Sequence, residues 1–90
     1  MKNVNIKITG KVQGVFFRAT TKIIADQMGV KGIVKNEKDG SVYLEAEGDE
    51  MMVDELINWC KEGPDKAKVE NVTVQEGIVK NYRNFEVVKK

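Results

Sequence analysis

The stretch Gly10-Lys11-Val12-Gln13-Gly14-Val15-Phe16-Phe17-Arg18 separates an alternating apolar pattern from a helical one in this 90-residue chain. It therefore predicts a turn between a strand and a helix. Successive backbone N–H groups in such a turn can converge on an anion, and the N-terminus of the following helix adds a positive dipole end. Arg18 offers a planar fork of donors that suits phosphate or carboxylate. The residues alone predict an anion-binding turn.

The sequence on either side of this turn predicts the strand and the helix that it joins. Val4, Ile6 and Ile8 alternate with polar residues, which is the pattern of a half-buried strand. After the turn, one stripe of positions recurs at helical spacing: Phe17, Thr21, Ile24, Ala25 and Met28. Gly29 stands where a residue in the left-handed conformation would end that helix.

The remainder of the chain predicts a hairpin, a second helix and further strands. Residues 30–36 and 42–46 read as strands, and Asp39-Gly40 between them is a strong hairpin signal. Asp49 is a candidate N-cap for the second helix, which Gly63-Pro64 ends. The apolar stripe of that helix is Val53, Leu56, Ile57 and Cys60. Two last strands are expected within residues 69–74 and 85–87.

This order of elements predicts the fold class. It reads β-α-β-β-α-β with a short extra strand, which is typical of an α+β, ferredoxin-like split β-α-β sandwich. We expect two helices on one face of a mostly antiparallel sheet of four or five strands. We also expect residues 1–90 to form a single domain.

The order also brings two distant parts of the chain together. Two strands joined by a helix run parallel, so the first two strands should end at the same edge of the sheet. The turn before Arg18 and Asn36, at the end of the second strand, should therefore be neighbours.

Composition limits the classes of function. Fifteen basic and fourteen acidic residues nearly cancel, so no global field favours nucleic acid or an anionic membrane, and anion recognition must be local. No signal peptide or membrane-spanning apolar run is found, and a single cysteine suits a reducing compartment, so we expect a cytoplasmic protein. Histidine is absent, which removes the commonest general base and the usual zinc ligand.

Each candidate residue also has an ordinary structural interpretation. An arginine such as Arg18 most often forms a surface ion pair. An asparagine before an Asp-Gly hairpin, as Asn36 is, commonly belongs to the turn. Cys60 lies in the apolar stripe of the second helix, so we expect a buried thiol rather than a nucleophile. Glu45 and Glu47 alternate outward from the third strand, and we expect them on a solvated face.

Several motifs resemble one known family. The opening stretch resembles the G-x-V-Q-G-V-x-F-R signature of acylphosphatases. Gly32-Ile33-Val34-Lys35-Asn36 and Asp39-Gly40-Ser41-Val42 resemble the second signature, G-W-V-x-N-x-x-D-G-x-V, with Ile33 where the family usually has tryptophan. Gly63-Pro64 with Ala67-Lys68-Val69, and the closing Tyr82-Arg83-Asn84-Phe85-Glu86-Val87, are similar to later segments of the family. The resemblance covers essentially the whole chain.

The resemblance implies an enzyme that hydrolyses the carboxyl–phosphate anhydride of acyl phosphates. Carried over residue by residue, Arg18 binds the phosphoryl group and Asn36 orients the attacking water. The backbone N–H groups that complete the cradle belong to Gln13, Gly14, Val15, Phe16 and Phe17. The family's reaction needs no metal ion, no other cofactor and no covalent phosphoenzyme. The implied partners are an acyl phosphate substrate and inorganic phosphate, as product or competitive ligand, with no nucleic acid and no membrane, and we expect a monomer.

Two other classes of protein share the predicted element order. An RNA-recognition domain stacks bases on aromatic residues of its central strands. Here residues 41–47 carry one aromatic and two acidic residues, and the first strand carries no aromatic residue. A ligand-sensing regulatory domain is normally attached to an enzyme, and a stand-alone chain with an intact cradle argues against it. The resemblance therefore favours the enzyme.

Overall fold

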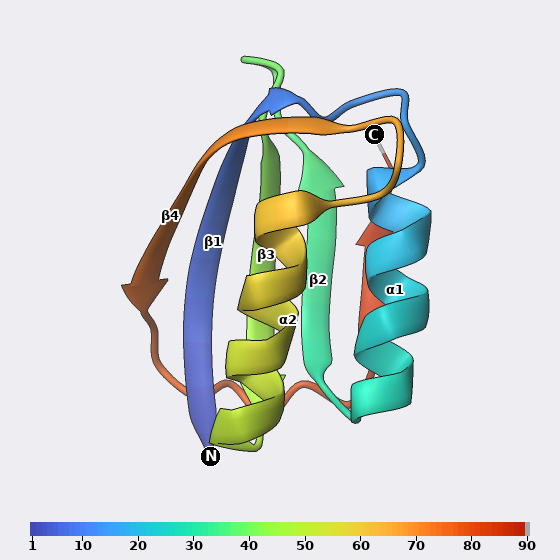
Figure 1. Cartoon of the computed structure of the whole chain (residues 1–90). Coiled ribbons are helices and arrows are strands. Elements are labelled where there is room, and N and C mark those ends of the chain that lie inside the picture. The colour runs from blue at the N-terminus through green and yellow to red at the C-terminus, as the bar shows by residue number, and fades with distance from the viewer. Residues whose placement is uncertain (90) are drawn as a thin grey trace.

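Two helices lie side by side on one face of a five-stranded sheet (Figure 1). The computed structural model describes residues 1–89. Its elements are β1 (Lys2–Lys11), α1 (Phe17–Met28), β2 (Lys31–Asn36), β3 (Val42–Gly48), α2 (Glu50–Glu62), β4 (Lys68–Glu76) and β5 (Phe85–Val88). The strand order is β4-β1-β3-β2-β5; the β2–β5 pair is parallel and the other neighbouring pairs are antiparallel. The predicted α+β sandwich is confirmed, and the short last strand is the fifth of the sheet.

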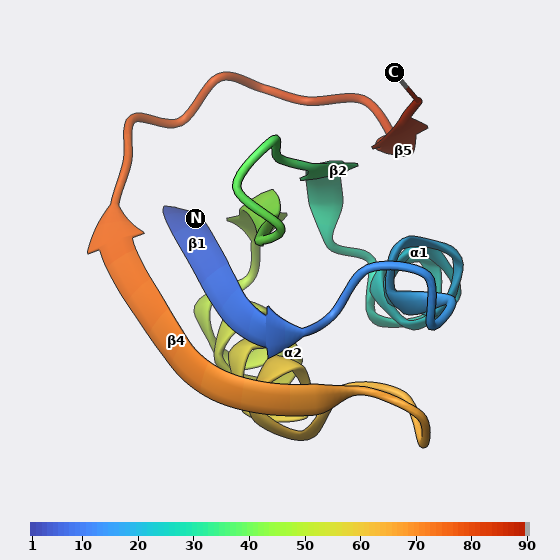
Figure 2. The ribbon, with the colours of Figure 1, turned by 90° about the horizontal axis from the view of Figure 1, so that it is seen from above.

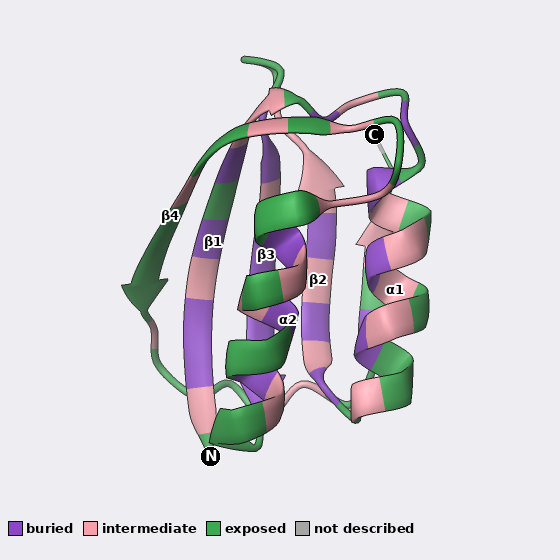
Figure 3. Ribbon diagram, in the orientation of Figure 1, coloured by how far each residue is buried: buried purple, intermediate pink, exposed green. Residues whose placement is uncertain are grey.

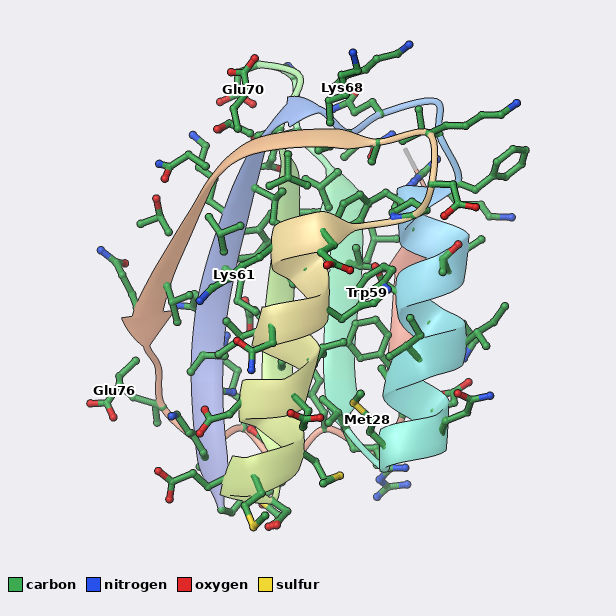
Figure 4. All side chains as sticks on the ribbon, viewed as in Figure 1. Met28, Trp59, Lys61, Lys68, Glu70 and Glu76 are labelled. Carbon is green, nitrogen blue, oxygen red and sulfur yellow. The ribbon has the colours of Figure 1, made fainter. Side chains whose placement is uncertain are left out.

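The core lies between the helices and the apolar positions of the two central strands. These positions pair across the sheet and are buried: Val4 with Ala46, Ile6 with Leu44 and Ile8 with Val42. Figure 3 shows buried residues along β1, β2 and β3 and on the inner stripe of each helix. The rings of Phe17 and Trp59 have centroids 5.4 Å apart, and Figure 4 shows Trp59 between the helices. This packing fixes where α1 begins, because Phe17 is its first residue.

The helix ends follow the sequence only in part. Gly29 has the left-handed conformation predicted for it, with φ 71°, and its N–H points back to the last turn of α1. Asp49 precedes α2 as predicted, but its carboxylate makes no capping hydrogen bond, so that part of the prediction is wrong. Its backbone carbonyl accepts from the N–H of Val53 at 2.9 Å. Glu50 supplies the negative charge that suits the first turn of a helix.

The predicted convergence at one edge of the sheet is confirmed. β1 and β2 are each antiparallel to β3, which lies between them, so they run parallel to one another. Both end at the upper edge in Figure 1, where α1 begins. The turn before Arg18 and the end of β2 at Asn36 therefore share this edge.

The face of the sheet opposite the helices is crossed by the connection between β4 and β5, residues 77–84 (Figure 2). Glu47, whose exposed fraction is 1%, holds this connection. Its carboxylate accepts hydrogen bonds from the backbone N–H groups of Lys80 at 2.7 Å and Tyr82 at 2.9 Å, and from Nδ2 of Asn3 at 2.9 Å. The expectation of a solvated face for Glu45 and Glu47 is therefore wrong. Both side chains are buried because residues 77–84 fold back over this face, and the alternation of residues along a strand does not reveal such a fold-back.

Glu45 lies two residues earlier on the same face and is 8% exposed. Its carboxylate pairs with the Lys80 ammonium at 2.8 Å and accepts from the hydroxyls of Tyr43 and Tyr82. Burial, and then the hydrogen bond to Glu45, raise the pKa of each tyrosine to about 12. Burial also acts to raise the pKa of Glu45 and Glu47, but the hydrogen bonds outweigh it and both pKa values are lowered. Both carboxylates are therefore ionised at neutral pH.

Glu47→Gln is expected to reduce the free energy of unfolding at neutral pH by about 2–3 kcal/mol, because the backbone N–H groups lose a charged acceptor. The folded-state pKa of Glu47 is below the ordinary 4.5, so its stabilisation is present above that value and is lost as the pH falls through the folded value. Urea unfolding from about pH 7 to about pH 3 measures this loss. Wild type should lose more stability over this range than Glu47→Gln.

Glu70→Gln is the matched control, because Glu70 on β4 is exposed and points into solvent (Figure 4). This control should keep both the stability and the acid dependence of the wild type. Equal acid dependence of Glu47→Gln and wild type would contradict the role of the buried carboxylate.

Candidate active site

The chain passes from β1 to α1 through a turn in which two residues have left-handed backbone. Gly14 has φ 73°, and Phe16 has φ 64° with ψ 23°. Glycine adopts this conformation freely because it has no Cβ. Phenylalanine does so at a cost of about 1–2 kcal/mol. Such strain concentrates at binding sites, where the surroundings fix the backbone. The predicted turn between strand and helix is therefore confirmed, and its backbone is left-handed at Gly14 and Phe16.

The backbone N–H groups of this turn are available to a ligand. No side chain caps α1, and its first turn holds no acidic residue. Within the described residues 1–89, the N–H groups of residues 13–17 donate none of the backbone hydrogen bonds found in turns and loops. The first such bond runs from Thr20 N–H to the Phe16 carbonyl at 3.0 Å. Unpaired donors at the positive end of a helix dipole form a natural anion site.

Arg18 is the second residue of α1 and extends toward β5. Its Nη1 donates to the Val88 carbonyl at 3.2 Å, and the side chain is half-buried. This contact orients the guanidinium while its other N–H groups remain for a ligand, since arginine carries five donors. No pattern in the sequence indicates that the last strand positions this arginine.

A pair of hydrogen bonds joins the turn to the segment that carries Asn36. Asn36 is the last residue of β2 and pairs with Val42. From the turn, Nε2 of Gln13 donates to the carbonyls of Glu37 at 2.8 Å and Ser41 at 2.9 Å. Both acceptors belong to the hairpin that follows Asn36. The Gln13 side chain thus holds this hairpin against the turn.

A groove of about 1070 Å³ brings these groups onto one surface. Gly14, Phe16, Arg18 and Asn36 line it, and it continues between α1 and β5. The two residues predicted to be catalytic therefore lie in the same groove. Among the predicted binding residues, Val15 and Phe17 have buried side chains, so they can offer a ligand only their backbone N–H groups.

Further along the groove, a second basic residue of α1 contacts β5. Nζ of Lys22 donates to Oδ2 of Asp26 at 3.0 Å and to the carbonyl of Phe85 at 2.8 Å. Arg18 and Lys22 thus each donate to a carbonyl of β5 and join α1 to this strand. Sequence reasoning identified the last strand but not this role, because periodicity does not indicate which helix a strand lies beside.

The thiol of Cys60 lies apart from this groove. Cys60 is buried in α2, and burial raises the pKa of its thiol to about 12. This agrees with the expectation of a structural thiol. In the part of the chain that the structure describes, no group of three or more carboxylate, thiol or imidazole side chains is arranged to hold a metal ion. The groove itself offers backbone N–H groups, a guanidinium and an amide.

Comparison with known proteins gives one consistent family. The family model described as Acylphosphatase matches residues 4–87. A protein of Ligilactobacillus salivarius named Acylphosphatase is 49% identical over 88 residues, which cover 97% of this chain and 98% of that protein. The acylphosphatase structure from Bacillus subtilis has a TM-score of 0.95 at 33% identity, covering 99% of this chain and 100% of its own. That from Coxiella burnetii has a TM-score of 0.93 at 38% identity, with 97% and 92% covered.

Proposed function

Since this chain belongs to the acylphosphatase family and hydrolyses acyl phosphates to a carboxylate and inorganic phosphate, we propose that Arg18 and Asn36 carry out this reaction in the groove between α1 and β5. One observation supports the assignment above the others. Arg18, Asn36 and the uncapped start of α1 border the same groove, although they come from separate parts of the chain.

In this proposal, Arg18 and the backbone N–H groups of residues 13–17 bind the phosphoryl oxygens. Phosphoryl transfer depends mainly on positioning and on stabilising charge on the equatorial oxygens. A guanidinium and N–H groups that are already in place supply this stabilisation without reorganisation during the reaction. The contact between Arg18 and the Val88 carbonyl holds the guanidinium against β5, in the groove that the turn also lines.

Asn36 orients the attacking water. Its amide oxygen accepts a hydrogen bond from the water, and its NH₂ group can donate to the phosphate. The water oxygen forms a bond to phosphorus while the bond from phosphorus to the acyl oxygen breaks. The leaving group is a carboxylate, which departs as a stable anion and needs no proton from a general acid. Because an amide takes no proton at neutral pH, the water proton passes to the phosphoryl group or to solvent.

The remaining features of the proposal follow the family. The reaction uses no metal ion, no other cofactor and no covalent phosphoenzyme, and inorganic phosphate competes with the substrate. Residues 1–90 act as a single, monomeric domain in the cytoplasm, without nucleic acid or membrane partners. Among the described residues, no helix has both the length and the apolar character needed to cross a bilayer.

Hydrolysis of benzoyl phosphate by the purified protein in the presence of EDTA tests the proposal. We expect turnover well above the spontaneous rate, and competitive inhibition by inorganic phosphate. Turnover that disappears with EDTA and returns with a divalent cation would reject the metal-free mechanism. Turnover at the spontaneous rate would reject the assignment of this groove as an active site.

Gln13→Met is expected to lower kcat for benzoyl phosphate about tenfold to a hundredfold, because small displacements of a positioning group have effects of this size. The substitution removes both hydrogen bonds that hold the hairpin of Asn36 against the turn. In an Asn36→Ala background the same substitution should have a much smaller effect, since the two changes act on one group.

Gln75→Met on the exposed surface of β4 is the matched control and should leave kcat unchanged. A full additional effect of Gln13→Met in the Asn36→Ala background would show that Gln13 does not act through Asn36.

A further inference from the structure

The groove extends well beyond the groups assigned to the phosphate. From the turn it follows the outward face of α1, where Phe16, Ala19 and Ile23 all line it. Ala19 and Ile23 are four residues apart in α1, so they lie on one side of the helix, and Phe16 is the turn residue that directly precedes it. β5 forms the opposite side, with Val87 and Glu86 among the lining residues. An apolar stripe thus runs beside Arg18 along the groove.

The two large residues of this stripe are exposed. Phe16 is 74% exposed and Ile23 is 58% exposed, so the core does not need either side chain. Phe16 is also held in the left-handed conformation, which glycine or asparagine would adopt with less strain. A bulky aromatic residue that is both strained and exposed, at the mouth of an anion site, points to a ligand that covers it.

We propose that Phe16, Ala19 and Ile23 form the subsite for the acyl group, and that the enzyme favours acyl phosphates with an apolar, especially aromatic, acyl group. The inference rests on the proposed function, because Arg18 and the turn must hold the phosphoryl end. A single bridging oxygen joins phosphorus to the acyl carbon. The acyl group therefore lies within one bridging atom of the cradle, and Phe16, Ala19 and Ile23 offer it an apolar surface in the same groove.

The charges along the groove do not select an anionic acyl group. They have both signs: Lys22, Lys31 and Lys89 against Asp26 and Glu86. Lys22, the basic residue one turn beyond Arg18, already binds Asp26 and the Phe85 carbonyl. Contact with the apolar stripe is therefore the main feature by which this groove can distinguish acyl groups.

The ratio of kcat/KM for benzoyl phosphate to that for acetyl phosphate tests the proposal, because the two substrates share the phosphoryl group and differ in the acyl group. Phe16→Asn removes the ring and keeps a residue that tolerates the left-handed conformation. Ile23→Ser shortens the stripe at its other end. Each is expected to lower the ratio about three- to tenfold. This is at or below the smallest discrimination usual for one apolar group in a closed pocket, because this groove is open.

Ile78→Ser is the matched control. Ile78 is 82% exposed but lies in the connection that crosses the opposite face, so its substitution should leave the ratio at the wild-type value. An unchanged ratio in both Phe16→Asn and Ile23→Ser would overturn the subsite, including the case in which kcat/KM falls equally for both substrates. A wild-type protein that hydrolyses neither substrate would instead reject the proposed function.

Discussion

Arg18→Ala is expected to lower kcat/KM for benzoyl phosphate by about a thousandfold, because the transferring phosphoryl group loses its principal counter-charge. The half-buried guanidinium acts at the positive end of α1, where it would itself be unfavourable without an anion. Binding of inorganic phosphate, measured by titration calorimetry, should weaken as well. Arg18→Lys keeps the charge but loses the planar fork, so it should recover only part of the activity.

Arg83→Ala is the matched control for this experiment, since Arg83 is an exposed arginine in the connection that crosses the far face of the sheet. It should retain wild-type kinetics. Circular dichroism and urea unfolding should change little in Arg18→Ala, because the side chain makes one backbone contact, to the Val88 carbonyl. Near-normal kcat/KM in a folded Arg18→Ala variant would exclude this arginine from catalysis.

Asn36→Ala is expected to lower kcat by about a hundredfold or more, because the attacking water loses the group that orients it. The inhibition constant of inorganic phosphate should change much less, since the turn and Arg18 still bind the anion. This separation of kcat from phosphate binding distinguishes a water-orienting residue from one that mainly binds phosphate. Asn58→Ala, on the exposed side of α2, provides the control.

A parallel loss of phosphate binding and kcat in Asn36→Ala would assign this residue to the phosphate instead of the water. Asn36→Asp gives a further comparison, because a carboxylate still accepts a hydrogen bond from water but repels the phosphoryl oxygens. We expect it to bind phosphate more weakly than Asn36→Ala does.

The face of the sheet away from the helices also bears on function. In an RNA-recognition domain, bases stack on aromatic residues of this face. Here residues 77–84 cross it, and Glu45 and Glu47 are buried beneath them and hydrogen-bonded to them. Tyr43 and Tyr82 use their hydroxyls to bind Glu45. The chain's own connection therefore covers the part of this face that carries Glu45 and Glu47, and the proposed active site lies at the edge of the sheet instead.

The same connection links stability to the active site. It leads from β4 to β5, and β5 carries the carbonyls that Arg18 and Lys22 bind. The buried carboxylate of Glu47 fixes the connection over the sheet, and β5 then lies in place beside α1. Loss of this anchor is expected to act first on stability, because the contacts between β5 and β2 remain.

The sequence by itself determined the elements and the two halves of the proposed site. Alternation at Val4, Ile6 and Ile8 and helical spacing after Phe17 reflect burial on one side of each element, which is a local property of the chain. The turn before Arg18 and the Asp-Gly hairpin after Asn36 depend on a few neighbouring residues. The strand–helix–strand order then placed both segments at one edge of the sheet, because two strands joined by a helix run parallel.

Only the tertiary structure decided how these parts are held and what surrounds them. The hydrogen bonds from Gln13 to the Glu37 and Ser41 carbonyls join residues more than twenty positions apart. The hydrogen bond from Arg18 to the Val88 carbonyl spans most of the chain. The burial of Glu47 depends on where residues 77–84 pass. Such contacts arise from packing between segments that are distant in the sequence, so no local pattern of side chains predicts them.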